Sequence, residues 1–346
     1  MTASEPLRIT IHLEEAPAPE TPFVLHCGEP IRGLVEVEVL EGVSFQSFQI
    51  GFQWHTEGKG NKDQGREGET LKLARDEEWS RGTTRQFPFD LRAPWGPLSY
   101  SGKILKVRWE LEARMERSLL RGDVREALPL ELVPVPEMGE VDLGPVPQKK
   151  ESLEAEKKGY AGVWLFLGVA CLVGAVVVGA VNGWEFSDPF RWVVFSLIAG
   201  GLLLTLRGFW RRLGKGKLGE PTVKLSTTEL RRGEEIHFGV VVRPENRTEI
   251  RSLEVVLECE ERVVHGHGQY QSHHRRQVYE RKMILAERKM VEVQRGLRRK
   301  GSLAIPPDAP VTFGAPSNQL IWWLRFRGDV VGWPDWKEPF LLTVRP

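Results

Sequence analysis

Four histidines within a window of ten residues are the side chains whose type and spacing could most readily do chemistry. The stretch VVHGHGQYQSHHRR carries them as His265, His267, His273 and His274. Histidines two positions apart on a strand face the same side, and four imidazoles could bind Zn²⁺ or Cu²⁺. The favoured interpretation is a Gly-rich hairpin tip, because the stretch HTEGKGNKDQGREGE in the first half is also long and polar. No pattern such as His-Glu-x-x-His supplies a base nearby, so a bound metal would be structural or regulatory.

A basic tract follows the histidines. Residues 275–300 contain ten Lys and Arg against Glu280, Glu287 and Glu292, in a chain whose formal net charge is only +1. The favoured interpretation is a pair of solvated strands, whose outward faces are normally charged. The alternative is contact with anionic lipid headgroups, which attract basic residues close to a membrane. The densest basic group would make that contact: Arg295, Arg298, Arg299 and Lys300.

Other motifs that could carry chemistry are weak. Gly214-Lys-Gly216-Lys-Leu-Gly219 matches G-x-G-x-x-G, but it does not link a strand to a helix, as a dinucleotide fold requires. No P-loop, no G-x-S-x-G elbow and no Cys-x-x-Cys pair occurs. Lys and Arg total 48 against 47 Asp and Glu, which leaves no bulk positive field for nucleic acid. The sequence therefore predicts a protein that is not an enzyme, takes no cofactor and does not bind nucleic acid.

The centre of the chain predicts a membrane hairpin. No residue from Tyr160 to Trp184 is charged, and about 20 apolar residues suffice to cross a bilayer. A second apolar run lies between Arg191 and Arg207, so we expect a hairpin over residues 160–210 with spans at about 160–181 and 191–210. A buried or re-entrant segment is the alternative for the second run. Lysines and arginines flank the hairpin outside its short loop, which predicts two spans in the cell membrane with both termini cytoplasmic.

The two halves on either side of this hairpin repeat each other. GEPIRGLVEVEV begins at Gly28, and GEEIHFGVVV begins 205 residues later at Gly233. A second block matches Pro97 with Pro310 and Trp109 with Trp323. Short runs of alternating apolar and polar residues with Gly and Pro between them are typical of half-buried strands in a β-sandwich. An all-β sandwich is therefore expected for each half.

These blocks carry a resemblance to a known family. Gly-Glu-x-Ile leading into a strand, then FPFDLRAP and PLSYSGKILKVRWELEAR, resemble the amino-terminal arrestin domain. The second half is similar to the carboxyl-terminal arrestin domain. The resemblance implies a tandem of immunoglobulin-like β-sandwiches that binds other proteins as an adaptor or scaffold, as arrestins, α-arrestins and bacterial sporulation-control proteins do. It brings no catalytic residues with it, and the inserted hairpin and the missing Pro-Pro-x-Tyr motif set this sequence apart from the family.

The sequence thus predicts an all-β protein with two arrestin-like β-sandwich domains separated by a two-helix transmembrane hairpin. We expect the domains at residues 1–137 and 219–346, with a juxtamembrane linker at 138–159. The predicted function is a membrane-anchored, non-catalytic adaptor or scaffold whose partners are an unidentified protein and the lipid bilayer. The alternative is a metal-binding or metal-responsive membrane protein that uses the four histidines.

Overall fold

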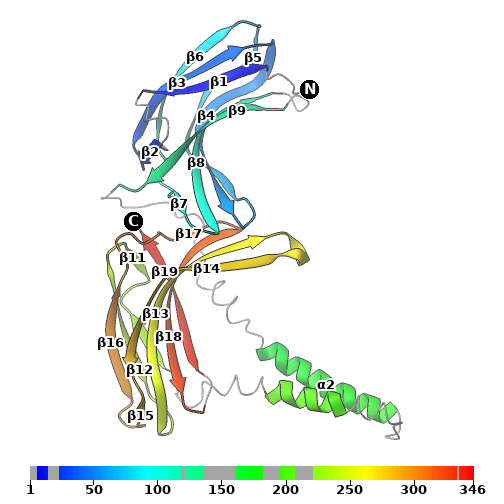
Figure 1. Cartoon of the computed structure of the whole chain (residues 1–346), viewed down its shortest axis with the longest axis vertical. Helices are drawn as coiled ribbons and strands as arrows, with labels where there is room; N and C mark the ends of the chain where they lie inside the picture. The colour runs from blue at the N-terminus through cyan, green and yellow to red at the C-terminus, as the bar shows by residue number, and fades with distance from the viewer. Residues whose placement is uncertain are drawn as a thin grey trace.

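The computed structural model consists of two β-sandwiches and a separate helical region (Figure 1). The residues that it describes are 6–14, 23–117, 122–135, 161–181, 195–206, 221–332 and 335–346. Strands dominate both halves, as the alternating sequence pattern predicts. The all-β tandem of sandwiches is therefore confirmed for the described residues.

Over its described residues, the amino-terminal sandwich contains nine strands in two sheets. A three-stranded sheet has the order β1-β3-β6, and a second sheet has the order β2-β9-β8-β4-β5 with β7 paired to β8. Strands β2 and β9 are parallel, and the other pairs are antiparallel. The strands are β1 (Leu7–Leu13), β2 (Phe23–His26), β3 (Pro30–Val39), β4 (Val43–Gly58), β5 (Gln64–Trp79), β6 (Thr84–Arg92), β7 (Tyr100–Ser101), β8 (Leu105–Glu116) and β9 (Val124–Val133).

The carboxyl-terminal sandwich has the same topology. Its sheets have the orders β10-β12-β16 and β11-β19-β18-β13-β14, with β17 paired to β18 and β15 to β13. Strands β11 and β19 form its parallel pair, the counterpart of β2 and β9. The elements are β10 (Thr222–Leu225), β11 (Glu229–Arg231), β12 (Glu235–Val242), β13 (Thr248–His265), the 3₁₀ turn η1 (Gly268–Tyr270), β14 (Ser272–Ala286), β15 (Lys289–Val291), β16 (Leu297–Ala304), β17 (Phe313–Gly314), β18 (Asn318–Val330) and β19 (Trp336–Arg345).

The repeat extends to single hydrogen bonds. Gly28 and Gly233 occupy the same tight turn with φ of 74° and 81°, a region that favours glycine. The turn is closed in the same way in both halves, because the backbone N–H groups of His26 and Arg231 each donate to a glutamate three residues on, at 2.7 Å. The sequence repeat at an offset of 205 residues is therefore a structural repeat.

One pairing within the predicted repeat is wrong by a single residue. The indole Nε1 of Trp109 donates to the Pro97 carbonyl at 2.7 Å, and the indole Nε1 of Trp322 donates to the Pro310 carbonyl at 2.8 Å. The structural counterpart of Trp109 is therefore Trp322 and not Trp323. Successive side chains of a strand point to opposite faces, so Trp323 lies on the other side of the sheet.

The central helical region includes α2 (Ala161–Val181) and a further helical segment at residues 195–206. For α2, the structure describes the side chains from Phe166 to Val177 except at position 168. Over the described residues, no helix is long and apolar enough to cross a membrane. The described part of the second predicted span has 12 helical residues, or about 18 Å of helix, against a hydrocarbon core of about 30 Å. The two-span hairpin is thus not shown by the structure, and the predicted linker at 138–159 lies outside the described residues.

Candidate functional site

The junction between the two sandwiches buries a carboxylate that the sequence did not single out. Glu261 on β13 is 1% exposed and accepts hydrogen bonds from three groups of the amino-terminal sandwich. The donors are the Tyr100 hydroxyl at 2.8 Å and the backbone N–H groups of Lys103 and Ile104, both at 3.1 Å. Burial, and then the hydrogen bond to Glu261, raise the pKa of Tyr100 well above its ordinary value, so the phenol stays protonated and donates.

A buried amide makes the opposite connection. Asn318, also 1% exposed, stands at the start of β18 in the carboxyl-terminal sandwich. Its Nδ2 lies 2.9 Å from the Thr56 hydroxyl, 2.6 Å from the Asn61 carbonyl and 2.7 Å from the Asp63 carboxylate. The same Asp63 carboxylate accepts the backbone N–H of Ser317 at 2.9 Å. The amino-terminal sandwich therefore donates two turn N–H groups to Glu261, and the carboxyl-terminal sandwich donates one to Asp63.

The two connections are related by the internal repeat. Glu261 stands 205 residues after Thr56, and Ser317 stands 213 residues after Ile104, the offsets of the two repeated blocks. The end of β13 thus contacts the turn before β8, and the end of β4 contacts the start of β18. Such a reciprocal contact has the form of a two-fold interface, here within one chain.

Further contacts and two glycines add to the junction. The Asn61 side chain exchanges two hydrogen bonds of 3.0 Å with the backbone of Gly266, and the Trp54 and Phe313 rings meet edge to face at 5.9 Å. A Cβ atom at Gly102 would collide with Glu261 Oε1, and one at Gly60 would collide with Asn318 Oδ1. Glycine at these two positions allows the backbone to approach both buried side chains. Glu261 and Asn318 belong to no motif, so no signal in the sequence marks them.

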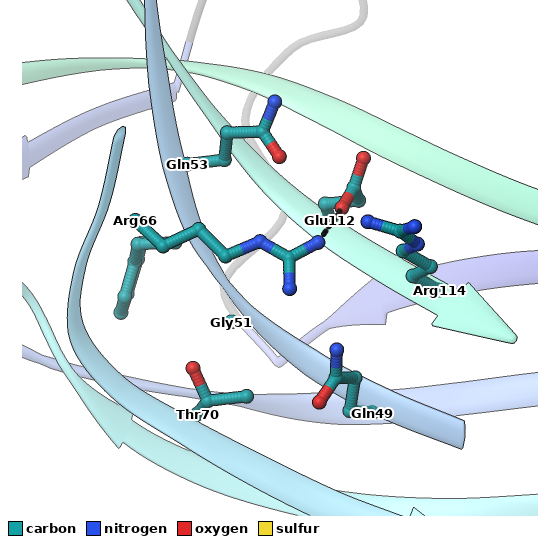
Figure 2. Close-up of a pocket in the computed structure, with 8 residues that line it drawn as sticks. Gln49, Gly51, Gln53, Arg66, Thr70, Glu112 and Arg114 are labelled. Carbon is teal, nitrogen blue, oxygen red and sulfur yellow. Dashed lines mark hydrogen bonds and ion pairs between the residues drawn. The ribbon is translucent and has the colours of Figure 1, made fainter. Parts of the chain in front are cut away.

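A polar hollow of about 460 Å³ is a second candidate site, on the face of the β2-β9-β8-β4-β5 sheet that points away from the core. Arginines from three strands line it, namely Arg66 on β5, Arg114 on β8 and Arg125 on β9. Glu112 forms its floor, with a side chain that is only 5% exposed and lies 3.1 Å from Arg66 Nη2. Figure 2 shows Arg66 and Arg114 on either side of this carboxylate, with the ion pair formed by Arg66. The Arg114 guanidinium instead donates to Asp123, which also lines the hollow, with its Nε at 3.1 Å.

The hollow exists because the edge strand β5 is irregular at this point. Gly51 faces Thr70 and Gln53 faces Arg66, so four steps along β5 match two steps along β4 and a bulge results. A smaller pocket of about 10 Å³ adjoins the hollow at Gly51, which has no side chain to fill it (Figure 2). Among the described residues, the side chains of Gln53 and Gln64 in the wall form no hydrogen bond with protein groups. These groups are available to a polar or acidic ligand.

The four predicted metal ligands do not come together. Strand pairing places His274 opposite Val263 and His273 opposite Val264, so these two histidines lie on opposite faces of the hairpin. In the described part of the chain, no group of three or more His, Cys, Asp or Glu side chains could hold a metal ion. His274 Nε2 lies within hydrogen-bond distance of the Ser272 hydroxyl, at 3.4 Å. Metal binding by His265, His267, His273 and His274 stays a prediction.

The predicted lipid-contacting residues divide into two kinds. Arg295, Arg298 and Lys300 are exposed, the first in a turn and the others on the edge strand β16. Arg299 instead points inward along the edge, where its Nε donates to the Leu285 carbonyl of β14 at 2.8 Å. Lipid contact at this face stays a prediction, and three of the four residues are available for it.

Comparison with known proteins yields little. No family model matches the chain, and no curated protein matches it. Among solved structures, the chain is similar to the crystal structure of Spo0M, a sporulation control protein from Bacillus subtilis, with a TM-score of 0.30 and 16% sequence identity. That match covers 37% of this chain and 49% of Spo0M, so the chain spans about half the length of that protein. The tandem of sandwiches rests on the strands described above, and membership of the arrestin family is a proposal.

Proposed function

We propose that this chain is a membrane-anchored, arrestin-like adaptor or scaffold protein whose two cytoplasmic β-sandwiches bind other proteins and catalyse no reaction. The observation that carries the proposal is the junction, where Glu261 and Asn318 are both 1% exposed and both hydrogen-bonded to the opposite sandwich. Domains joined by a small interface normally move relative to one another. A buried network with satisfied partners specifies one arrangement instead. A fixed arrangement lets two sandwiches present one composite surface.

The side chains of the polar hollow support an extended protein segment as the binding partner. Its spare guanidinium N–H groups and its two uncommitted carboxamides suit acidic and amide groups of an extended protein segment. The hollow is open and crosses strands β5, β4, β8 and β9, so a segment could lie across the sheet. We therefore place the main docking face on this side of the amino-terminal sandwich.

Replacing one hollow arginine should weaken partner binding without unfolding the protein. Arg125→Ser is suited to this test, because its side chain is 70% exposed and its pair with Glu112 is long at 3.8 Å. The free energy of unfolding should change by no more than about 0.5 kcal/mol. A photo-cross-linking residue at Gln53 should capture a protein partner in cells, and Arg125→Ser should reduce the yield of that adduct several-fold.

The matched control is Arg8→Ser, which removes an arginine that is 71% exposed and sits on the other sheet. Its adduct yield should equal that of the unaltered protein. An equal loss of adduct in both variants, or adducts that form only with a cross-linker at Arg8, would place the docking face elsewhere.

Membrane anchoring is supported by the composition and exposure of α2. Its described apolar side chains contact little protein, as Phe166 is 75%, Val169 52% and Val173 56% exposed. Exposed apolar patches of this kind mark surfaces that another phase or partner covers. Lipid fits the uncharged run from Tyr160 to Trp184 better than a protein groove would.

Topology reporters test the anchoring directly. Fusions at Glu5, Ser187 and Phe340 should report a cytoplasmic position at the first and third sites and an external position at the second. A cytoplasmic signal at Ser187 would contradict the two-span topology. This outcome would leave the docking proposal intact, because the hollow lies entirely within the amino-terminal sandwich.

A further inference from the structure

A small cleft lies at the junction, between equivalent segments of the two sandwiches. It is lined by residues 97–100 from one half and residues 310–313 from the other, together with Arg232 and Leu320. The two segments are related by the repeat offset of 213 residues. The cleft has a volume of about 30 Å³, and a cavity needs about 10–15 Å³ of such space to hold one water molecule.

Arg232 brings an unpaired positive group to this cleft. It directly follows β11, and its backbone N–H donates to the Arg345 carbonyl at 3.1 Å. Its side-chain Nε is buried and has no hydrogen-bond partner within the part of the chain that the structure describes. Burial lowers the pKa of this guanidinium, while the charge of Asp308 acts in the opposite direction. A buried donor without an acceptor costs about 1 to 3 kcal/mol, so an acceptor is expected at this position.

Two hydroxyl groups that line the cleft also have a proton to donate. Ser99 Oγ accepts the backbone N–H of Leu132 at 2.8 Å, and Thr312 Oγ1 accepts that of Val344 at 2.8 Å. Each hydroxyl keeps its own proton after accepting. These two bonds are counterparts in the repeat, so the cleft receives the same donor from each sandwich.

Two carbonyl acceptors in the same walls are already engaged. The Pro97 and Pro310 carbonyls accept the indole N–H groups of Trp109 and Trp322. The Tyr100 hydroxyl donates to Glu261, and no acidic residue is among the described residues that line the cleft. The described lining therefore offers donors from Arg232, Ser99 and Thr312, and its one charged side chain is positive.

From these observations we propose that the junction cleft binds a small monovalent anion of the size of chloride, held by Arg232, Ser99 and Thr312. An anion accepts from all three donors at once, whereas a water molecule would direct one of its own hydrogens against them. The small volume favours an anion close to a water molecule in size over phosphate or sulfate. Since the donors come from both sandwiches, the bound anion stabilises their arrangement.

The first test is thermal unfolding of the full chain at constant ionic strength, with potassium gluconate replaced stepwise by potassium chloride. The melting temperature should rise and saturate as a single-site curve, because a ligand that binds only the folded state stabilises it by mass action. Arg232→Gln should weaken the apparent chloride affinity at least tenfold. Arg231→Gln, which alters the exposed neighbouring arginine, should leave the curve unchanged.

A second measurement does not depend on a variant that folds. Crystals of the unaltered protein grown in bromide should show an anomalous scattering peak in the cleft, within hydrogen-bond distance of Arg232 Nε. Chloride stabilisation that never saturates and is equal in Arg232→Gln would overturn the proposal, as would bromide peaks that occupy only surface sites. Neither result bears on partner binding at the polar hollow.

Discussion

Replacing Glu261 with alanine should lower the free energy of unfolding of the full chain by about 3 to 5 kcal/mol. The carboxylate accepts three hydrogen bonds from Tyr100, Lys103 and Ile104 and is 1% exposed. Alanine would leave the three donors buried without an acceptor. Each orphaned donor costs about 1 to 3 kcal/mol, and partial entry of water reduces the sum.

Urea unfolding followed by tryptophan fluorescence measures this loss. Glu261→Gln keeps one carbonyl oxygen as an acceptor and should cost less than Glu261→Ala. Glu235→Ala is the matched control, because this exposed glutamate on β12 should change the free energy of unfolding by no more than about 0.5 kcal/mol. Loss of the junction should also split the transition, since each sandwich then unfolds by itself.

A loss below about 1 kcal/mol for Glu261→Ala, with a single transition retained, would mean that Glu261 does not hold the sandwiches together. The double variant with Tyr100→Phe adds a further check. The two changes remove the same hydrogen bond, so their effects should be less than additive.

The fold could be predicted from the sequence because its signals are local. Alternation of apolar and polar residues over β3 and β12 predicts one buried face. This face is fully buried in the structure, with 0% exposure at Val35, Val37, Ile236 and Val240. Gly28 and Gly233 mark the same turn in both halves, since both adopt positive φ. These features depend on residues close together in the chain, and the repeat shows each of them twice.

The junction could not be predicted because its partners are remote in sequence. Glu261 lies in the charged run CEER and looks like an ordinary solvated residue of a strand. Its burial depends on backbone N–H groups that are 157 and 158 residues away. The polar hollow was missed for a similar reason, as it depends on a bulge that brings Arg66 opposite Gln53.

The histidine cluster shows the opposite limitation. His273 and His274 are adjacent in sequence, yet adjacent positions on a strand face opposite sides. The imidazoles of His273 and His274 therefore lie apart, on opposite faces of the strand. Strand register, which single-sequence patterns define poorly, decides whether such a cluster can form a metal site.

Register also decides the roles of two neighbouring tryptophans, Trp322 and Trp323, both 0% exposed. Trp322 packs beside Tyr279 at a ring distance of 5.5 Å and donates its indole N–H to Pro310. Trp323 lies on the other face of the sheet, where Arg262 and Arg325 stack on its ring at 5.1 and 4.8 Å. Its indole Nε1 is buried without a hydrogen-bond partner.

The two residues should therefore respond differently to the same substitutions. Trp322→Ala should cost about 3 to 5 kcal/mol of unfolding free energy through the cavity that it leaves in the core. Trp322→Phe should still cost about 2 kcal/mol, because the Pro310 carbonyl loses its donor. Trp323→Phe should cost no more than about 1 kcal/mol, since it removes an N–H group that has no partner and keeps a ring beneath the two arginines. Urea unfolding of the full chain ranks the three variants, and a larger loss for Trp323→Phe than for Trp322→Phe would contradict this difference in their roles.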